Sequence, residues 1–89
     1  MNEFEWDENK RSINLQKHGI DFIDAVLVFD DPNRIELETI RNNEHRFITI
    51  GIVSGVIILV VYTHRKEKKR LISARCASAE ERKYYESSN

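Results

Sequence analysis

The longest run of uncharged residues in the chain extends from Phe47 to Thr63 and is rich in isoleucine and valine. Gly51 and the Ser54-Gly55 pair interrupt it. A membrane-spanning helix needs about 20 predominantly apolar residues, whereas two β-branched runs around a pair of small residues are typical of a β-hairpin. The pattern therefore predicts two central strands, followed by a basic turn and a third strand over 70–75.

A two-residue turn at Ser54-Gly55 would place opposite each other those residues whose numbers sum to 109. One side of the hairpin, here called the apolar face, would then carry Ile48, Ile50, Ile52, Ile57, Leu59 and Val61. We expect the helices to pack there. The other side, here called the mixed face, would carry Phe47, Thr49, Gly51, Val53, Val56, Ile58, Val60 and Tyr62, with His64 beyond. An even number of residues in the basic turn would add Leu71, Ser73 and Arg75 to the mixed face, and an odd number would reverse that assignment.

Helix-capping residues mark the elements of the N-terminal part. Residues 4–6 fit a short strand or an extended lead-in, and Asp7 can cap a helix that runs to about His18. Gly19 suits the left-handed position that closes a helix. Asp21 can cap a second segment over 22–29, whose apolar residues fit either a strand or a helical stripe.

The first predicted helix carries cations on or near its packed side, among them Lys10, Lys17 and His18. A buried cation without a partner is costly, so the arrangement is expected of a helix that lines an anion site. The alternative is that the lysines extend to water and His18 hydrogen-bonds a nearby carbonyl.

Turn signals and alternation predict the remaining elements. Residues 30–33 form a turn and residues 34–41 alternate as in a strand. A capping box from Ser78 to Glu81 begins a C-terminal helix of about two turns. Together these elements predict one α+β domain over residues 1–89, with a twisted, mainly antiparallel sheet of three or four strands, two N-terminal helices on the apolar face and a C-terminal helix.

Composition narrows the classes of function. The single cysteine, Cys76, provides neither a disulfide framework nor a cysteine-based zinc site and fits a reducing cytoplasm. The N-terminus lacks the basic and apolar regions of a signal peptide. The net charge of −1 conceals a division, because residues 1–45 carry a net −6 and residues 46–89 a net +5. The basic segment over 64–75 could neutralise phosphates, or it could be a solvated turn that discourages pairing between sheet edges.

The chain has no glycine-rich phosphate loop, and its three histidines are far apart in sequence. We therefore expect no metal or cofactor. Metal-free RNA cleavage needs a base for the ribose 2′-hydroxyl, cationic donors for the phosphorane and an acid for the leaving oxygen. The catalytic candidates are His18, Arg65, Arg75, Lys10, Tyr62 and His64; the RNA-binding candidates are Arg46, Lys68, Lys69, Arg70, Ser73 and Thr63. The same groups would also suit a non-catalytic module that binds nucleic acid or an acidic protein.

Segments 6–32, 60–65 and 70–86, with the motifs KHGIDF, VYTHR and ISAR, resemble the BrnT family of bacterial type II toxins. The motif positions are Lys17, His18, Gly19, Phe22, Tyr62, Thr63, Arg65, Ser73, Ala74 and Arg75. Position 76, often basic in such sequences, is here Cys76.

This resemblance implies a compact domain similar to RelE ribonucleases, a helix over 22–29, and translation arrest through RNA cleavage. It also implies neutralisation by a BrnA-type antitoxin with a ribbon-helix-helix DNA-binding domain, in a hetero-oligomer that represses its own operon. On this hypothesis Arg65 and Arg75 stabilise the phosphate. His18 or His64 acts as base or acid, with Lys10 or Tyr62 as substitutes.

Overall fold

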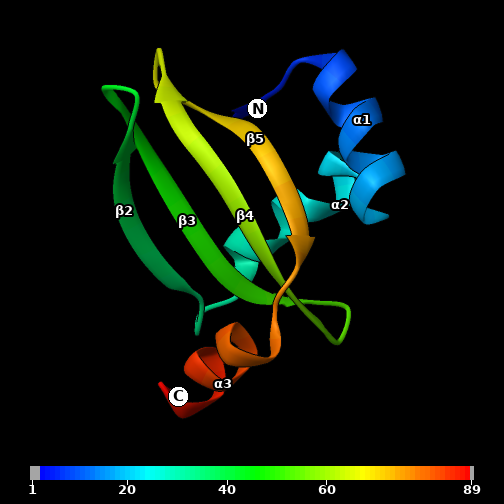
Figure 1. Ribbon diagram of the computed structural model, residues 1–89, viewed down its shortest axis with the longest axis vertical. Coiled ribbons are helices and arrows are strands. Elements are labelled where there is room, and N and C mark those ends of the chain that lie inside the picture. The colour runs from blue at the N-terminus through cyan, green and yellow to red at the C-terminus, as the bar shows by residue number, and fades with distance from the viewer. Residues whose placement is uncertain (1–2, 89) are drawn as a thin grey trace.

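Residues 3–88, which the computed structural model describes, contain one mixed sheet of five strands (Figure 1). Across the sheet the order is β1 (Phe4–Glu5), β5 (Lys68–Cys76), β4 (Val56–Arg65), β3 (Glu44–Val53) and β2 (Ile35–Arg41). Strands β2 to β5 are antiparallel neighbours, whereas β1 runs parallel to β5. The α+β class is confirmed, but the expected three or four strands are too few. The segment over 4–6, which remained open between a short strand and an extended lead-in, contains the additional strand β1.

The helices begin and end at the capping residues. α1 (Glu8–His18) starts at Asp7, whose side chain accepts a 2.8 Å hydrogen bond from the Asn9 amide, and ends at Gly19 with φ 75°. The segment that remained open between strand and helix is helical, with α2 (Phe22–Ala25) followed by a 3₁₀ helix, η1 (Val26–Asp30). The predicted capping box begins α3 (Ala79–Ser87). Among residues 3–88, no helix has the length and apolar character needed to cross a bilayer.

The central hairpin has the predicted register. Ser54 and Gly55 both have positive φ, 50° and 83°, as the favoured two-residue hairpin turn requires. Phe47 lies opposite Tyr62 and Val53 lies opposite Val56. The assignment of side chains to the apolar and mixed faces of the hairpin is therefore confirmed.

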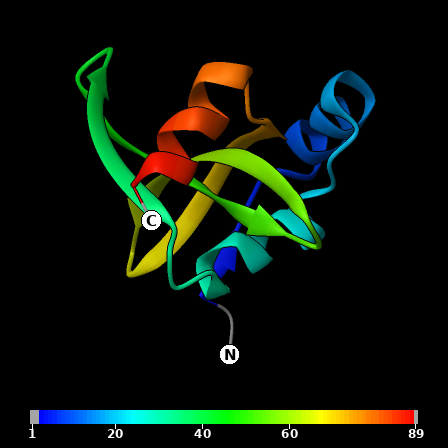
Figure 2. The ribbon, with the colours of Figure 1, turned by 90° about the horizontal axis from the view of Figure 1, so that it is seen from below.

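α2 and η1 pack on the mixed face and α1 lies at the edge of β5, so the predicted position of the two N-terminal helices on the apolar face is wrong. Figure 2 shows α2 and η1 on one side of the sheet and α3 on the other. The core of the mixed face comprises Phe22, Ala25 and Val28 against Ile58, Val60, Leu71 and Ala74. Small residues allow this approach, because a Cβ at Gly51 would lie 2.8 Å from Val28 Cγ2. The apolar face receives α3 instead, where Tyr85 packs near Ile50 and Leu59.

A bulge in β5 reverses the face of the sheet to which each side chain in the second half of the strand belongs. The β4–β5 turn, Lys66-Glu67, has the even length considered above, and Leu71 lies opposite Tyr62 on the mixed face as expected. The register then shifts, so that Val61 faces Ser73 and Leu59 faces Arg75. One extra residue in a strand reverses every later side chain. Ser73 and Arg75 consequently lie on the apolar face, and their expected place on the mixed face is wrong.

Candidate functional site

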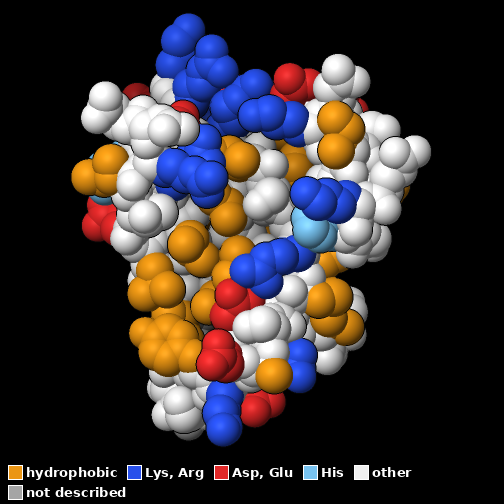
Figure 3. Space-filling model, in the orientation of Figure 1, with side chains coloured by type: hydrophobic (Ala, Val, Ile, Leu, Met, Phe, Trp, Pro, Cys, Tyr) orange, Lys and Arg blue, Asp and Glu red, His pale blue; other side chains and the backbone are white. Residues whose placement is uncertain are grey.

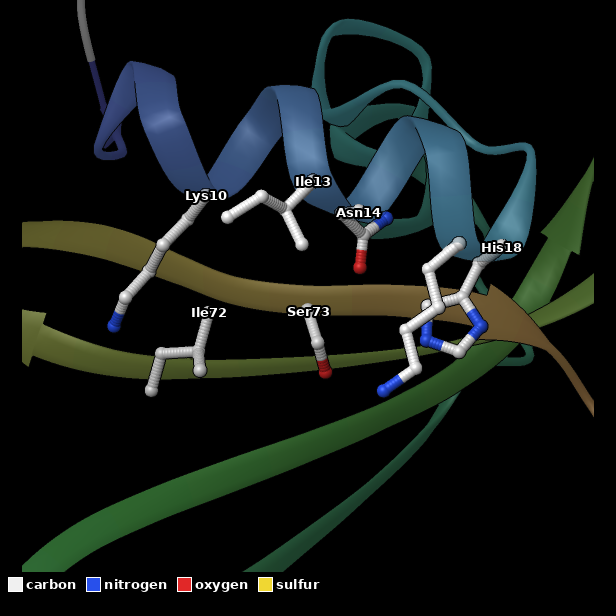
Figure 4. Close-up of a pocket in the computed structure, with 7 residues that line it drawn as sticks. Lys10, Ile13, Asn14, His18, Ile72 and Ser73 are labelled. Carbon is white, nitrogen blue, oxygen red and sulfur yellow. The ribbon is translucent and has the colours of Figure 1, made fainter.

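α1 lies beside β5 and leaves a cleft of about 240 Å³ between the two elements. This α1–β5 cleft is lined by Lys10, Ile13, Asn14, Lys17, His18, Ile72 and Ser73. Figure 4 shows Lys10 and His18 extending from α1 toward β5 at opposite ends of the cleft, with Ser73 between them. The structure thus brings three of the predicted site residues together, two from α1 and one from β5.

Asn14 holds α1 against β5. Its Nδ2 donates to the Ala74 carbonyl at 2.8 Å and to the Ile20 carbonyl at 3.0 Å, and the Ala74 amide donates to Oδ1 at 3.0 Å. The residue is only 5% exposed. Its amide replaces a neighbouring strand at the edge of β5, beyond the end of β1, and so fixes the positions of His18 and Lys10 relative to Ser73. Sequence reasoning missed this role, for which the available signal was an uncharged amide on the packed side of a helix.

An ion pair joins the N-terminal half of α1 to the start of α2. Arg11 Nε donates to Asp21 Oδ1 at 2.7 Å, and Arg11 Nη2 donates to Asp21 Oδ2 at 3.1 Å. The hydrogen bond from Arg11 lowers the pKa of the Asp21 carboxyl below its ordinary value. Because Asp21 also caps α2, the ion pair fixes the C-terminal end of the Gly19 turn that follows His18.

Arg75 continues the site from Ser73 along the same face of β5. Its Nη1 and Nη2 donate to the two carboxylate oxygens of Glu81 at 2.8 and 2.9 Å. This bidentate pair lowers the pKa of Glu81 to about 2 and raises that of Arg75. The same carboxylate accepts a 2.8 Å hydrogen bond from the Ser78 amide in the capping box of α3. The capping box was predicted from sequence, but its attachment to Arg75 was missed.

A second group of cations, here called the basic end, lies on the apolar face near the β4–β5 turn. It comprises Arg46, Arg65, Lys68 and Arg70, with Thr63 between them. Figure 3 shows lysine and arginine side chains gathered over this end of the sheet. Some of these cations have acidic partners, since Arg70 pairs with Glu5 at 3.1 Å and Arg46 with Glu44 at 2.8 Å.

Arg65 and Arg75 lie on the same face of the sheet, at its two ends. Arg65 pairs with Lys68 in the register, whereas Arg75 pairs with Leu59, six residues back along β4. At about 3.3 Å per residue, this separation is about 20 Å. The two arginines therefore lie too far apart to contact one phosphate group.

Tyr62, His64 and Lys69 lie on the mixed face, across the sheet from the α1–β5 cleft. Tyr62 is 4% exposed, and its hydroxyl donates to Glu36 Oε1 at 2.9 Å. Burial, reinforced by the Glu36 hydrogen bond, raises the pKa of Tyr62 to about 12. The structure does not bring these residues to the cleft. Within residues 3–88, no group of three or more His, Cys, Asp or Glu side chains could hold a metal ion.

The family described as "Ribonuclease toxin, BrnT, of type II toxin-antitoxin system" matches residues 6–81. The chain belongs to this BrnT family. No curated protein matches it. The BrnT match extends from the residue before the N-cap of α1 to Glu81, so it includes both walls of the cleft, the basic end and Arg75. BrnT membership makes the chain a ribonuclease toxin of a type II system, which implies an RNA target and an antitoxin partner.

Proposed function

We propose that this BrnT toxin is a metal-independent endoribonuclease whose reaction centre is the α1–β5 cleft. The observation that carries the proposal is that Lys10, Lys17 and His18 of α1 line one cleft together with Ser73 of β5. An imidazole and primary ammonium groups can supply the base, the acid and the cationic donors that phosphodiester cleavage without a metal requires, and a hydroxyl adds a hydrogen-bond donor.

The chemistry assigned to the cleft is attack of the ribose 2′-oxygen on the adjacent phosphorus. Neutral His18 accepts the 2′-hydroxyl proton, the P–O5′ bond breaks, and the 5′-oxygen takes up a proton. The products are a 2′,3′-cyclic phosphate and a 5′-hydroxyl. Lys10 lies two turns of α1 from His18 and acts as the general acid that protonates the 5′-oxygen. Lys17 and Ser73 donate hydrogen bonds to the phosphate oxygens.

The basic end would bind phosphates of nucleotides outside the cleft. Arg65 and Lys68 are cross-strand neighbours there. Arg46 and Arg70 lie beside them, and each forms an ion pair with an acidic residue. Arg75 lies between these cations and α3 and would donate to the phosphate nearest Ser73. Because Glu81 already fixes the plane of the Arg75 guanidinium, this donor is oriented before RNA binds.

The antitoxin partner would be a BrnA-like protein with a ribbon-helix-helix domain, in a hetero-oligomer that binds operator DNA through the antitoxin. RNA cleavage would arrest translation in the cytoplasm. The apolar face offers a contact region of suitable chemistry, because α3 leaves Leu37 and Ile52 partly exposed below the basic end. An acidic, amphipathic segment would complement both the apolar strip and the cations.

Cleavage of single-stranded RNA by the purified chain in EDTA tests the function. We expect cyclic-phosphate ends, and a rate that falls by about 10²- to 10⁴-fold in His18→Gln. Lys10→Ala should also slow cleavage, whereas Lys83→Ala, its matched control on α3, should not. RNA that stays intact in EDTA, together with undiminished toxicity of His18→Gln and Arg75→Ala in cells, would overturn the proposal. RNA binding without either cleavage or growth arrest would favour a non-catalytic module instead.

A further inference from the structure

The mixed face carries a continuous stack of rings near the β4–β5 turn. The His45 and Phe47 ring centroids are 5.2 Å apart with an interplanar angle of 15°, and those of Phe47 and Tyr62 are 5.4 Å apart at 24°. His64 meets the Phe47 ring edge-on, at 4.8 Å and 70°. These residues come from two adjacent central strands, β3 and β4. We call this group the ring stack.

The inner end of the ring stack is fixed in the core. Tyr62 donates its hydroxyl to Glu36, which also accepts from Thr49 at 2.9 Å. Phe29 of η1 contacts the Tyr62 ring edge-on at 5.2 Å. Rings held in this way lose little conformational freedom when another ring packs against them, which is the advantage of a preorganised surface.

The outer end of the ring stack is open. The His45 side chain is 56% exposed although one of its ring faces lies against Phe47. Its Nε2 lies 2.6 Å from Glu38 Oε2, which fixes the orientation of the ring. A further planar group could therefore extend the stack on His45 without displacing any described contact.

Cations border the rings. Lys69 is the register partner of His64, and its Nζ lies 5.4 Å from the centroid of the Phe29 ring. Lys66 lies in the β4–β5 turn, and the basic end lies on the opposite face of the same strands. The nearby carboxylates of Glu36 and Glu38 are engaged with Tyr62 and His45. Lys66 and Lys69 form no ion pair among residues 3–88, and planar rings beside such cations match the chemistry of a nucleotide, with its flat base and its phosphate.

We propose that the ring stack binds unpaired bases of the RNA, with His45 and Phe47 as the stacking surface and Lys69 as a phosphate contact. The inference rests on the proposed function, because it takes RNA as the target. Proteins that read single-stranded RNA stack its bases on aromatic and imidazole rings displayed by a sheet. Since the α1–β5 cleft opens elsewhere on the molecule, the bound strand passes over the β4–β5 turn, where the cations lie on both faces. A double helix cannot present its stacked bases to His45, so the surface selects single strands.

Binding of a 2′-O-methyl RNA tests the inference separately from catalysis, because this RNA cannot be cleaved by 2′-oxygen attack. Affinity is measured by fluorescence anisotropy, and stacking by the quenching of a 2-aminopurine base in the oligonucleotide. His45→Ala and Phe47→Leu should weaken binding of an unstructured strand about 5- to 100-fold and reduce the quenching. Tyr84→Leu, which removes an exposed aromatic ring on α3 instead, should change neither.

Thermal unfolding of each variant shows whether it is folded, and His45→Ala keeps the test available should Phe47→Leu fail to fold. The inference is overturned if folded variants bind and quench as the unchanged protein does. It is also overturned if they bind RNA normally and lose only their association with the antitoxin, since the ring stack would then be a protein interface. A chain that binds this RNA through the rings but never cleaves RNA would uphold the inference and refute the proposed function.

Discussion

Asn14 carries out at the scale of one residue what a neighbouring strand would otherwise do. Asn14→Leu keeps the branching of the side chain at Cγ but leaves the amide and the carbonyl of Ala74 without their partner. An unpaired buried polar group costs about 1 to 3 kcal/mol, so the free energy of unfolding should fall by about 2 to 4 kcal/mol in urea titrations. Asn9→Leu, at an exposed position of the same helix, should change it by less than about 0.5 kcal/mol. Equal effects at the two positions would contradict the role assigned to Asn14.

The ion pair of Glu81 with Arg75 makes a pH-dependent contribution to the free energy of unfolding. Its folded pKa of about 2 lies below the ordinary 4.5, because Arg75 hydrogen-bonds the carboxylate. The stabilisation is therefore complete above pH 4.5 and is lost as the pH falls toward 2. The Arg75 side chain is 39% exposed, so solvent screening limits the term to about 1 kcal/mol.

Thermal unfolding of Glu81→Gln, compared with the unchanged protein between pH 5 and pH 2, measures this contribution. The difference in melting temperature between the two proteins should shrink as the pH falls. A difference that stayed constant over this window would show that the Glu81 carboxylate is not stabilised by Arg75.

At the scale of elements, α3 is attached through Tyr85. The Tyr85 hydroxyl donates to Asp31 Oδ2 at 2.6 Å, and the same carboxylate oxygen accepts from the Ile52 amide at 2.9 Å. The hydrogen bond to Asp31, aided by burial, raises the pKa of Tyr85 to about 12. Tyr85→Phe should reduce the free energy of unfolding by about 2 kcal/mol, because hydrogen bonds to charged groups are worth about that much.

Tyr84→Phe is the matched control for this change, because Tyr84 precedes Tyr85 in α3 and is exposed. It should leave the free energy of unfolding within about 0.5 kcal/mol of the original value. Chemical denaturation of both variants decides the matter, and similar losses in the two would show that Asp31 does not hold α3 in place.

The close approach of η1 to β3 depends on the absence of a side chain at Gly51. A Cβ there would lie 2.8 Å from Val28 Cγ2 and 3.1 Å from Asp31 Oδ2. Gly51→Ala should therefore destabilise the protein by about 1 to 3 kcal/mol through overpacking. Adding Val28→Ala should cost less in the Gly51→Ala background than alone, because it removes the clashing methyl group. Strict additivity of the two losses in urea titrations would count against this contact.

Elements fixed by neighbouring residues were predictable, and those fixed by distant ones were not. The Ser54-Gly55 hairpin and the caps at Asp7 and Ser78 depend on local geometry, so their positions follow from sequence. The bulge in β5 depends on how that strand fits β4 and α1, and no residue type marks it. Its effect on Ser73 and Arg75 shows how a one-residue shift moves side chains from the predicted face of a sheet to the opposite one.

At the scale of the whole molecule, the acidic and basic halves of the sequence are interleaved. Glu5 of β1 pairs with Arg70 of β5, and Glu44 pairs with Arg46 within β3. The separation of charge along the chain therefore overstates the separation in space. The distribution of charge along the sequence also does not show how the candidate residues divide among the cleft, the basic end and the ring stack, because only the folded sheet determines which face each residue occupies.

The salt dependence of RNA binding distinguishes a phosphate-binding basic end from a solvated turn. For single strands, the logarithm of the binding constant falls with the logarithm of salt concentration by about 0.7 for each phosphate neutralised. Arg65→Ala and Lys68→Ala should each lower that slope by about 0.7. Lys83→Ala, an exposed lysine on α3, should leave it unchanged.

Anisotropy titrations over a range of salt concentrations, again with 2′-O-methyl RNA, provide the slopes. Arg70→Ala should give a smaller change than Arg65→Ala, because Arg70 already has Glu5 at 3.1 Å and releases fewer ions when RNA replaces that partner. Slopes that were the same for all four variants would mean that the cations near the β4–β5 turn remain solvated. The RNA would then reach the α1–β5 cleft without contacting the basic end.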